Sequence, residues 1–308
     1  MLKYVDDLII DRITRKRARL NTMLNNQDQV FDALRTLQTE FIQMSTTIEG
    51  GNLTVEDVEY IIRTGESILK KSKRHQVIAL NHLQAQKYLN DPVIKNRDID
   101  LEIVQEVHRR LMIFAYNQAG RFRVNAFNKN DNVSEKLEDL MEGLFVNKKF
   151  HVVEEAALFN SFFQRIRPFN YGNGLTARML MKHLMNKQGY LFSLQLNEYE
   201  VQYYRKCEDQ AAEGIYRPLI NTIASCCERS FDTMIDKLRT VDVKKKKEEE
   251  KIRPEMMVDI SYVFDLVLDN PNNFKGMKKI SSPNDIKRLR SLVSDMEKGY
   301  KAMQEDKS

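Results

Sequence analysis

Apolar residues recur every three to four positions along most of this 308-residue chain. The spacing is clearest in three segments: Val30, Leu34, Leu37, Phe41 and Met44; Leu101, Val104, Val107 and Leu111; Ala157, Leu158, Phe162 and Ile166. This is the period of an α-helix that buries one face. Strand-like alternation is rare, and "RFRVNAFNKND", residues 121–131, is the best example. We therefore expect an almost all-α protein with one small β-hairpin.

Few residues interrupt these helical segments, because the chain has only 6 prolines and 11 glycines. Gly50 and Gly51 follow one predicted helix, and a capping box of Thr54 with Asp57 starts the next. Near the other end, the charge run "VDVKKKKEEEKIRPE", residues 241–255, fits an exposed helix or a linker. The helices after this run have no motif that we can interpret.

The composition is that of a globular protein in a reducing compartment. Apolar residues make up 42% of the chain and charged residues 30%. No run of about 18 apolar residues occurs, so we expect no membrane span. The first residues lack the order of a secretory signal, and the three cysteines do not suggest a disulfide framework. We expect a cytoplasmic protein, and the spacing of the five histidines gives no reason to expect zinc.

The net charge of +5 is a mild excess spread over many positions. The strongest local cluster is "RITRKRARL", residues 12–20, which offers a contact for nucleic acid or for an acidic partner. A solvated helix face explains such a cluster more simply, so we do not expect nucleic-acid binding.

The segment "IRPFNYGNGLTARML", residues 166–180, carries the candidate chemistry. A Gly-Asn-Gly lies between two apolar, helix-forming stretches. The N-terminus of a helix binds anions, because its first N–H groups lack partners in the helix and its dipole is positive there. A short glycine motif alone fits a plain helix-start turn equally well.

Taken with its surroundings, this segment resembles the Fic (Fido-fold) family, whose motif is His-x-Phe-x-Asp/Glu-Gly-Asn-Gly-Arg-x-x-Arg. Here residues 167–178 read "RPFNYGNGLTAR". Upstream, "STTIEGG", residues 45–51, is similar to the family's inhibitory-helix pattern, Ser/Thr-x-x-x-Glu-Gly/Asn. Further similar stretches are "VHRRLM", "AGRFR" and "QGYLFSLQLNEYEVQYYRKCEDQAAEGIYRPLINTI".

The resemblance implies an all-α Fic/Fido helical domain with a small β-hairpin flap and a C-terminal helical appendage. We divide the chain into an N-terminal helical segment at 1–38, a Fic-like domain with its inhibitory-type helix at 39–238, and a charged linker with the appendage at 239–308. The family's flap corresponds to Phe122 to Asp131, where the open edge of a hairpin can pair with an extended segment of a target protein. The resemblance also leaves a homodimer open.

Active members of the family transfer AMP from ATP to a protein hydroxyl, and three motif positions differ here. The general base is replaced by Arg167, whose guanidinium stays protonated and cannot accept a proton. The Mg²⁺ ligand is replaced by Tyr171, a neutral phenol that binds hard cations poorly. The first motif arginine is replaced by Leu175. The resemblance therefore implies a pseudoenzyme, with Arg167 at the position of the base, no assigned catalytic residue and no expected metal site.

The motif residues that remain are Phe169, which the resemblance places in the core, and those that would bind a phosphate. The resemblance assigns Gly172, Asn173 and Gly174 to a nucleotide cradle, together with Arg178. In the family the second arginine of the motif grips the terminal phosphate or pairs with an inhibitory glutamate, which here is Glu49. That pair is either inhibitory or only a structural salt bridge between helices, and we favour the structural interpretation.

Three further side chains near the motif have a functional and a plain interpretation. Arg167 is either a new phosphate ligand or a solvated side chain. His151, at the predicted start of the helix before the motif, is more simply a surface residue than a substitute base. His108 fits a position in or beside the core.

We expect a regulatory module that binds a protein, or ATP or another nucleotide, and we do not expect it to bind Mg²⁺. One alternative is an active nucleotidyl or phosphoryl transferase with altered chemistry. Another is a DNA- or protein-interaction scaffold built on the basic cluster and the C-terminal helices.

Overall fold

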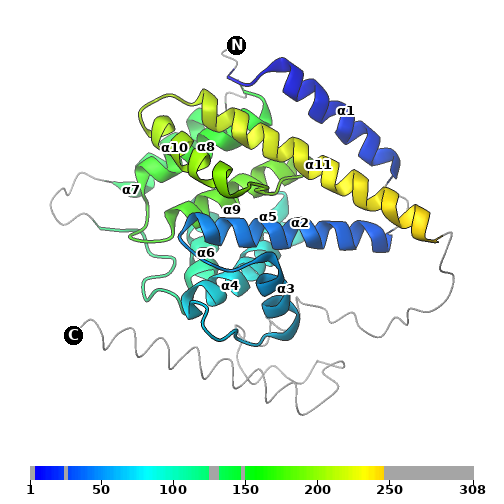
Figure 1. Ribbon diagram of the computed structural model, residues 1–308. Coiled ribbons are helices and arrows are strands. Elements are labelled where there is room, and N and C mark those ends of the chain that lie inside the picture. Colours follow the sequence, from blue (N-terminus) through cyan, green and yellow to red (C-terminus); the bar gives the residue numbers. More distant parts are fainter. Residues whose placement is uncertain (1–3, 24–26, 125–131, 147–149, 246–308) are drawn as a thin grey trace.

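The chain folds into a bundle of α-helices (Figure 1). The computed structural model describes residues 4–23, 27–124, 132–146 and 150–245. These residues contain no β-strand, which confirms the predicted all-α class. Phe122 to Val124, at the start of the predicted flap, have no regular secondary structure. The rest of the predicted hairpin, residues 125–131, and residues 246–308 of the predicted linker and C-terminal appendage lie outside the described residues.

The helices differ widely in length. Their bounds are α1 Asp7–Met23, α2 Gln27–Ile48, α3 Val55–Thr64, α4 Lys73–Asn90, α5 Pro92–Lys95, α6 Leu101–Met112, α7 Val133–Met141, α8 Val152–Ile166, α9 Asn173–Lys187, α10 Glu198–Ala212 and α11 Arg217–Lys245, with a π-helical turn over Glu142–Val146.

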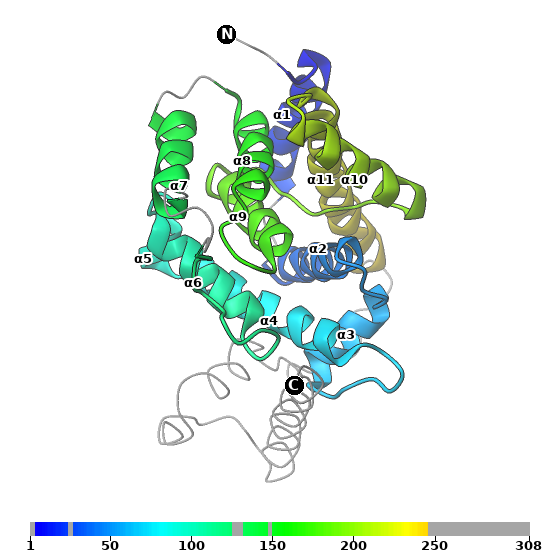
Figure 2. The ribbon, with the colours of Figure 1, turned by 90° about the vertical axis from the view of Figure 1, so that its left-hand side faces the viewer.

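Helices α8 and α9 form the centre of the bundle. They pack against each other, α6 packs on α9, and α10 and α11 pack on α8 (Figure 2). Their buried apolar side chains belong to one large hydrophobic cluster that includes Phe159, Phe163, Phe169 and Leu180. A smaller cluster attaches α3 to α2 and α4. The loop between α8 and α9 therefore lies at the junction of several helices.

Two predicted domain boundaries fall inside helices. Helix α2 runs without a break through residues 38 and 39, and α11 continues past residue 238 to Lys245. The charge run at 241–255 is compatible with a helix, so its first residues extend α11 instead of ending it. The N-terminal segment also packs on the domain, because α1 lies along α11 (Figure 1).

Two residues of the basic cluster of α1 form ion pairs that hold this helix against α11. Arg12 Nε lies 2.8 Å from Glu228 Oε1 on α11. Lys16 Nζ lies 2.9 Å from Glu228 Oε1 and 2.6 Å from Asp232 Oδ2. Ion pairs within the chain thus account for part of the cluster on which the nucleic-acid alternative depended.

Local sequence signals set several helix ends. The predicted capping box is confirmed, since the Thr54 hydroxyl accepts a hydrogen bond from the Asp57 N–H and the Asp57 carboxylate accepts one from the Thr54 N–H. His151 caps α8 in the same reciprocal way with Glu154. No described helix combines the length and the apolar character that a bilayer crossing requires.

Candidate functional site

The loop between α8 and α9 is held by its own backbone and by one asparagine. Helix α8 ends at Arg167, which adopts the left-handed conformation with φ 49°. Asn173 then braces the turn. Its Oδ1 accepts a hydrogen bond from the Phe169 N–H at 2.9 Å, and its Nδ2 donates to the Phe169 carbonyl at 2.7 Å. Phe169 is 1% exposed, which confirms its predicted place in the core. Asn173 is therefore a structural brace of the cradle.

His108 on α6 holds the loop between α8 and α9 in place. The Gly120 N–H donates to His108 Nδ1 at 2.8 Å, so Nε2 must carry the proton that it donates to the Tyr171 carbonyl, 3.0 Å away. The imidazole also stacks on Phe169, with ring centroids 3.6 Å apart. Burial lowers the pKa of His108 to about 4, so the ring is neutral. The sequence placed His108 in the core but gave no sign that it positions the motif loop.

The two glycines of the cradle have distinct structural reasons. Gly172 caps α9 with φ 73°, and a Cβ there would collide with Met112. A Cβ on Gly174 would collide with the Glu49 carboxylate and with the Arg178 guanidinium. No side-chain hydrogen bond caps α9 at Gly172. The Glu49 carboxylate instead lies close to this helix start, where the helix dipole favours negative charge.

Arg178 and Glu49 form the ion pair that the resemblance implied. Arg178 Nη2 lies 2.6 Å from Glu49 Oε1. Two hydrogen bonds to Ser45 on α2 hold the same guanidinium, from Nε to Oγ at 3.1 Å and from Nη2 to the carbonyl at 3.2 Å. The Arg178 side chain is 1% exposed and that of Glu49 is 34% exposed. Glu49 thus closes the solvent side of a buried cation.

A second carboxylate, which the sequence did not indicate, lies on the other side of Arg178. Glu208 Oε1 on α10 is 3.9 Å from Arg178 Nη1 and accepts a hydrogen bond from Gln164 Nε2 at 2.7 Å. Burial raises the pKa of Glu208, and the charge of Arg178 opposes that rise. Helix α10 begins 20 residues after Arg178, so only the packing of the helices shows this contact.

The three replaced motif positions lie in different surroundings. Arg167 is exposed, and its carbonyl accepts a hydrogen bond from Arg123 Nε at 2.6 Å. Tyr171 is 51% exposed, and its ring meets the edge of Tyr116 with centroids 4.9 Å apart. Leu175 is 2% exposed in the main core. The structure thus brings together Gly174, Arg178 and Glu49, but it does not bring Leu175 to the surface of the cradle.

These surroundings do not fit the metal that the family resemblance implies. Tyr171, at the metal-ligand position, offers a phenol in place of a carboxylate. Among the described residues, no three His, Cys, Asp or Glu side chains gather so that they could hold a metal ion. The site thus lacks the carboxylate with which a Mg²⁺ ion would be held.

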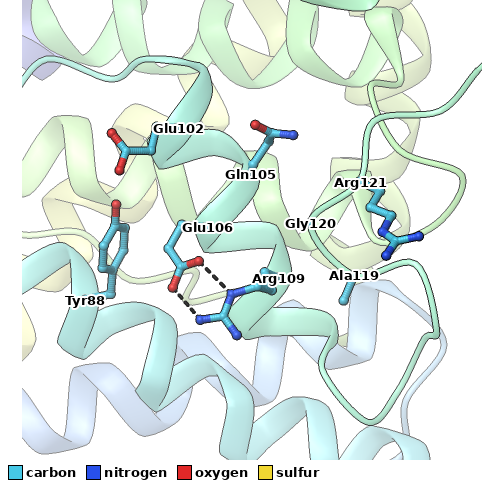
Figure 3. A pocket seen from close by; sticks show the side chains of 8 residues that line it. All are labelled: Tyr88, Glu102, Gln105, Glu106, Arg109, Ala119, Gly120 and Arg121. Atoms are coloured by element: carbon cyan, nitrogen blue, oxygen red, sulfur yellow. Dashed lines mark hydrogen bonds and ion pairs between the residues drawn. The ribbon is translucent and has the colours of Figure 1, made fainter. Parts of the chain in front are cut away.

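A separate open pocket of about 570 Å³ lies beside α6 (Figure 3). The residues that line it are Tyr88, Glu102, Gln105, Glu106, Arg109, Ala119, Gly120 and Arg121. Both oxygens of Glu106 are engaged, by Arg109 Nε at 2.6 Å and by Arg109 Nη2 and Arg110 Nε at 2.7 and 2.6 Å. The pocket has charges of both signs and contains none of the cradle residues.

Comparison with known proteins agrees with the geometry. Residues 98–185 match the sequence model of the Fic/DOC family. The protein adenylyltransferase Fic of Nematostella vectensis is 29% identical over 247 residues, which cover 76% of this chain and 57% of that protein. The protein of the same name from Aedes aegypti is 27% identical over 245 residues, covering 75% and 48%. The chain thus spans about half the length of the curated relatives it matches.

Solved structures support the fold. Fic-1 from C. elegans superposes with a TM-score of 0.67 at 23% identity, over 74% of this chain and 71% of that one. A Fic domain-containing signaling protein from Bacteroides thetaiotaomicron gives a TM-score of 0.65 at 17% identity, over 79% and 100%. At these identities the likeness is one of fold.

Proposed function

We propose that this chain, whose residues 98–185 match the Fic/DOC family model, is a regulatory module that binds a nucleotide or phosphate and is impaired in AMP transfer. The observation that carries this proposal is the position of the Glu49 carboxylate, 2.6 Å from Arg178 and against Gly174. A carboxylate occupies the place where the family resemblance puts a phosphate. An anion that displaced Glu49 would meet the same cation and the same helix N-terminus.

The groups available for binding are few but suited to an anion. Arg178 supplies a fixed guanidinium, because Ser45 and Glu208 hold it independently of Glu49. The first turn of α9 supplies backbone N–H groups. Arg167 supplies an exposed cation two residues before Phe169. None of these groups requires a metal ion.

The impairment follows from the chemistry of the replaced positions. An exposed arginine stays protonated at neutral pH and cannot take the proton of an attacking hydroxyl. Phosphoryl transfer depends on positioning and on charge around the phosphates, and a base or a stabilising charge each contributes about 10²–10⁴ in rate. Arg167, Tyr171 and Leu175 supply neither the base, the carboxylate nor the first arginine of the motif.

Calorimetric titration with ATP, without and with Mg²⁺, tests the binding. A ligand that binds only the open site has its affinity reduced by the fraction of open molecules. We expect Glu49→Ala to tighten the apparent Kd for ATP by about tenfold or more, and Arg178→Gln to abolish binding. The matched control is Glu59→Ala, which removes an exposed carboxylate from α3. If neither protein binds ATP, the proposal that the module binds a nucleotide is wrong. If both bind ATP equally, Glu49 does not occupy the place of the ligand, and the observation on which the proposal rests no longer supports it.

A transfer assay tests the impairment. Glu49→Ala protein is incubated with Mg²⁺ and ATP labelled at the α-phosphate, and incorporation into protein is followed. We expect no incorporation, because removing Glu49 opens the site without supplying a base. Metal-dependent incorporation would overturn the impairment and favour an active transferase.

A further inference from the structure

Helix α10 contacts the end of α2 through Arg205. Arg205 Nη2 donates to the Ile48 carbonyl at 2.7 Å and to the Thr47 carbonyl at 3.1 Å. These carbonyls belong to the last turn of α2, where the helix itself leaves acceptors unsatisfied and a cation is favoured by the dipole. Arg205 is thus a C-terminal cap supplied by another helix.

The capped carbonyls lie next to the group that closes the cradle. Glu49 directly follows Ile48, and the chain then turns through Gly50 with φ 87°. The turn is held by two short hydrogen bonds, from the Gly50 N–H to the Thr47 carbonyl and from the Gly51 N–H to the Thr46 carbonyl, both 2.9 Å. The position of Glu49 is therefore set by a glycine-containing turn and by the cap of Arg205.

The same helix fixes the other side of the ion pair. Three residues after Arg205, Glu208 approaches Arg178, and Gln164 of α8 holds it in place. On Arg178 itself, the Ser45 contacts remain when Glu49 leaves. The part that can move away from the cradle is thus the segment after Ile48, and Arg205 is the side chain that fastens its start to α10.

We propose that Arg205 is a positioning residue that keeps the end of α2 in place and so holds the Glu49 carboxylate over the cradle. This inference rests on the proposed function, because its consequence for ligands assumes that Glu49 blocks an anion site. A closed arrangement with Glu49 on Arg178 exchanges with an open one. Loss of the Arg205 cap raises the open fraction and tightens the apparent affinity of any ligand that binds the open site.

The experiment compares four variants of the full chain with the wild type. Arg205→Gln removes the cation, and Arg205→Lys keeps a charge that can reach a carbonyl. Lys206→Gln is the matched control, since it removes the neighbouring exposed cation of α10. Glu49→Ala marks the fully open site. Each protein is titrated with ATP, and hydrogen exchange is followed at the amides of Glu49, Gly50 and Gly51.

We expect Arg205→Gln to tighten the Kd for ATP by about threefold to tenfold, within the limit set by Glu49→Ala, and to speed exchange of the three amides by a similar factor. Arg205→Lys is expected to restore most of the wild-type behaviour, and Lys206→Gln to match the wild type. If Glu49→Ala tightens ATP binding while Arg205→Gln changes neither affinity nor exchange, the role of Arg205 is wrong and the proposed function stands.

The opposite failure is also recognisable. If neither the wild type nor Glu49→Ala binds ATP, the proposed function is wrong. Faster exchange at Glu49 to Gly51 in Arg205→Gln, but not in Lys206→Gln, would then still show that Arg205 holds the end of α2. Unchanged exchange in that case would contradict the positioning role of Arg205 as well as the proposed function.

Discussion

The two sides of the cradle are built differently. On the side of α2, Arg178 is 1% exposed and its guanidinium contacts Ser45, Glu49 and Glu208. On the opposite rim, Arg167 is exposed and Tyr171 is 51% exposed, with a ring contact to Tyr116. The first side has the character of a protein core, and the second has that of an ordinary surface.

The contrast between the two sides shows which of them the fold holds in one geometry. Removing one partner of a buried ion pair leaves the other charge buried without a partner or water. This costs a large part of the free energy of folding, and the cost keeps the arrangement around Arg178 in one geometry. Exposed side chains carry little such penalty, so the fold alone does not hold the rim in one geometry. The fold thus fixes the α2 side of the cradle more firmly than the exposed rim, and the substitutions that follow test that contrast.

The largest effect is expected from Arg178→Met. The substitution leaves Glu208 buried without its cation and Ser45 without its donor, so the free energy of unfolding should fall by about 3–5 kcal/mol. Urea denaturation at pH 7 measures it. The control is Arg97→Met. The Arg97 side chain is 37% exposed and pairs with Asp100 and Glu102 at the surface, so its loss should change stability far less. Equal losses in the two variants would contradict the contrast between core and surface.

Leu175→Arg should come next. This substitution restores a motif arginine by sequence, but position 175 is 2% exposed and packs in the main cluster. A buried unpaired guanidinium together with the lost apolar contact should reduce the free energy of unfolding by about 2–4 kcal/mol. Tyr171→Arg, on the exposed rim, should reduce it by less than about 1 kcal/mol. Thermal unfolding of both variants measures the two losses. A Leu175→Arg variant as stable as the wild type would mean that the introduced arginine reaches the surface of the cradle.

His108 is buried but bonds to the backbone of Tyr171 on the exposed rim, so its removal should have an intermediate effect on stability. In His108→Phe the Gly120 N–H and the Tyr171 carbonyl lose their partner, which should lower the free energy of unfolding by about 2 kcal/mol at pH 7. His183→Phe is the control, because His183 Nε2 is buried without a hydrogen-bond partner. This control should lose less stability at pH 7, and similar losses would contradict the bracing role of His108.

The same two variants test a dependence on pH. Burial lowers the pKa of His108 and of His183 from 6.5 to about 4. As the pH falls from 6.5 to 4, the unfolded chain takes up these protons and the folded chain does not, so stability falls over that window. Denaturation at pH 7 and pH 4.5 should show a smaller pH effect in each variant than in the wild type. An undiminished pH effect would mean that these histidines are not the groups that titrate.

The sequence predicted what depends on local period and on short motifs. Helical spacing gave the all-α class, the Thr54–Asp57 box was confirmed in its hydrogen bonds, and the Fic-like patterns indicated that Glu49 and Arg178 would meet. The domain limits at residues 38 and 238 followed the extent of the family resemblance, and helices α2 and α11 each run through one of them.

Contacts between distant segments were beyond sequence reasoning. His108 lies 63 residues from Tyr171, and Arg205 lies 157 residues from Ile48. Both lie in stretches that resemble the family, but no pattern in those stretches indicates the partner of either side chain. The partner depends on which helix end packs beside it. The burial of Leu175 was hidden for the same reason, since the motif places an arginine there and only the packing of α9 shows which face is covered.

The smallest expected effect concerns Arg167 and tests the rim most directly. Its backbone is left-handed with φ 49°, a conformation that costs a residue with a Cβ about 1 kcal/mol more than glycine. Arg167→Gly should therefore raise the free energy of unfolding by up to about 1 kcal/mol, whereas Arg167→Ala should change it little. Arg165→Gly, in the last turn of α8, should instead lower it by roughly that amount. Chemical denaturation measures whether each substitution raises or lowers the free energy of unfolding. A loss of stability in Arg167→Gly would show that the Arg167 side chain stabilises the fold. The exposed rim would then contribute to stability as the buried side of the cradle does.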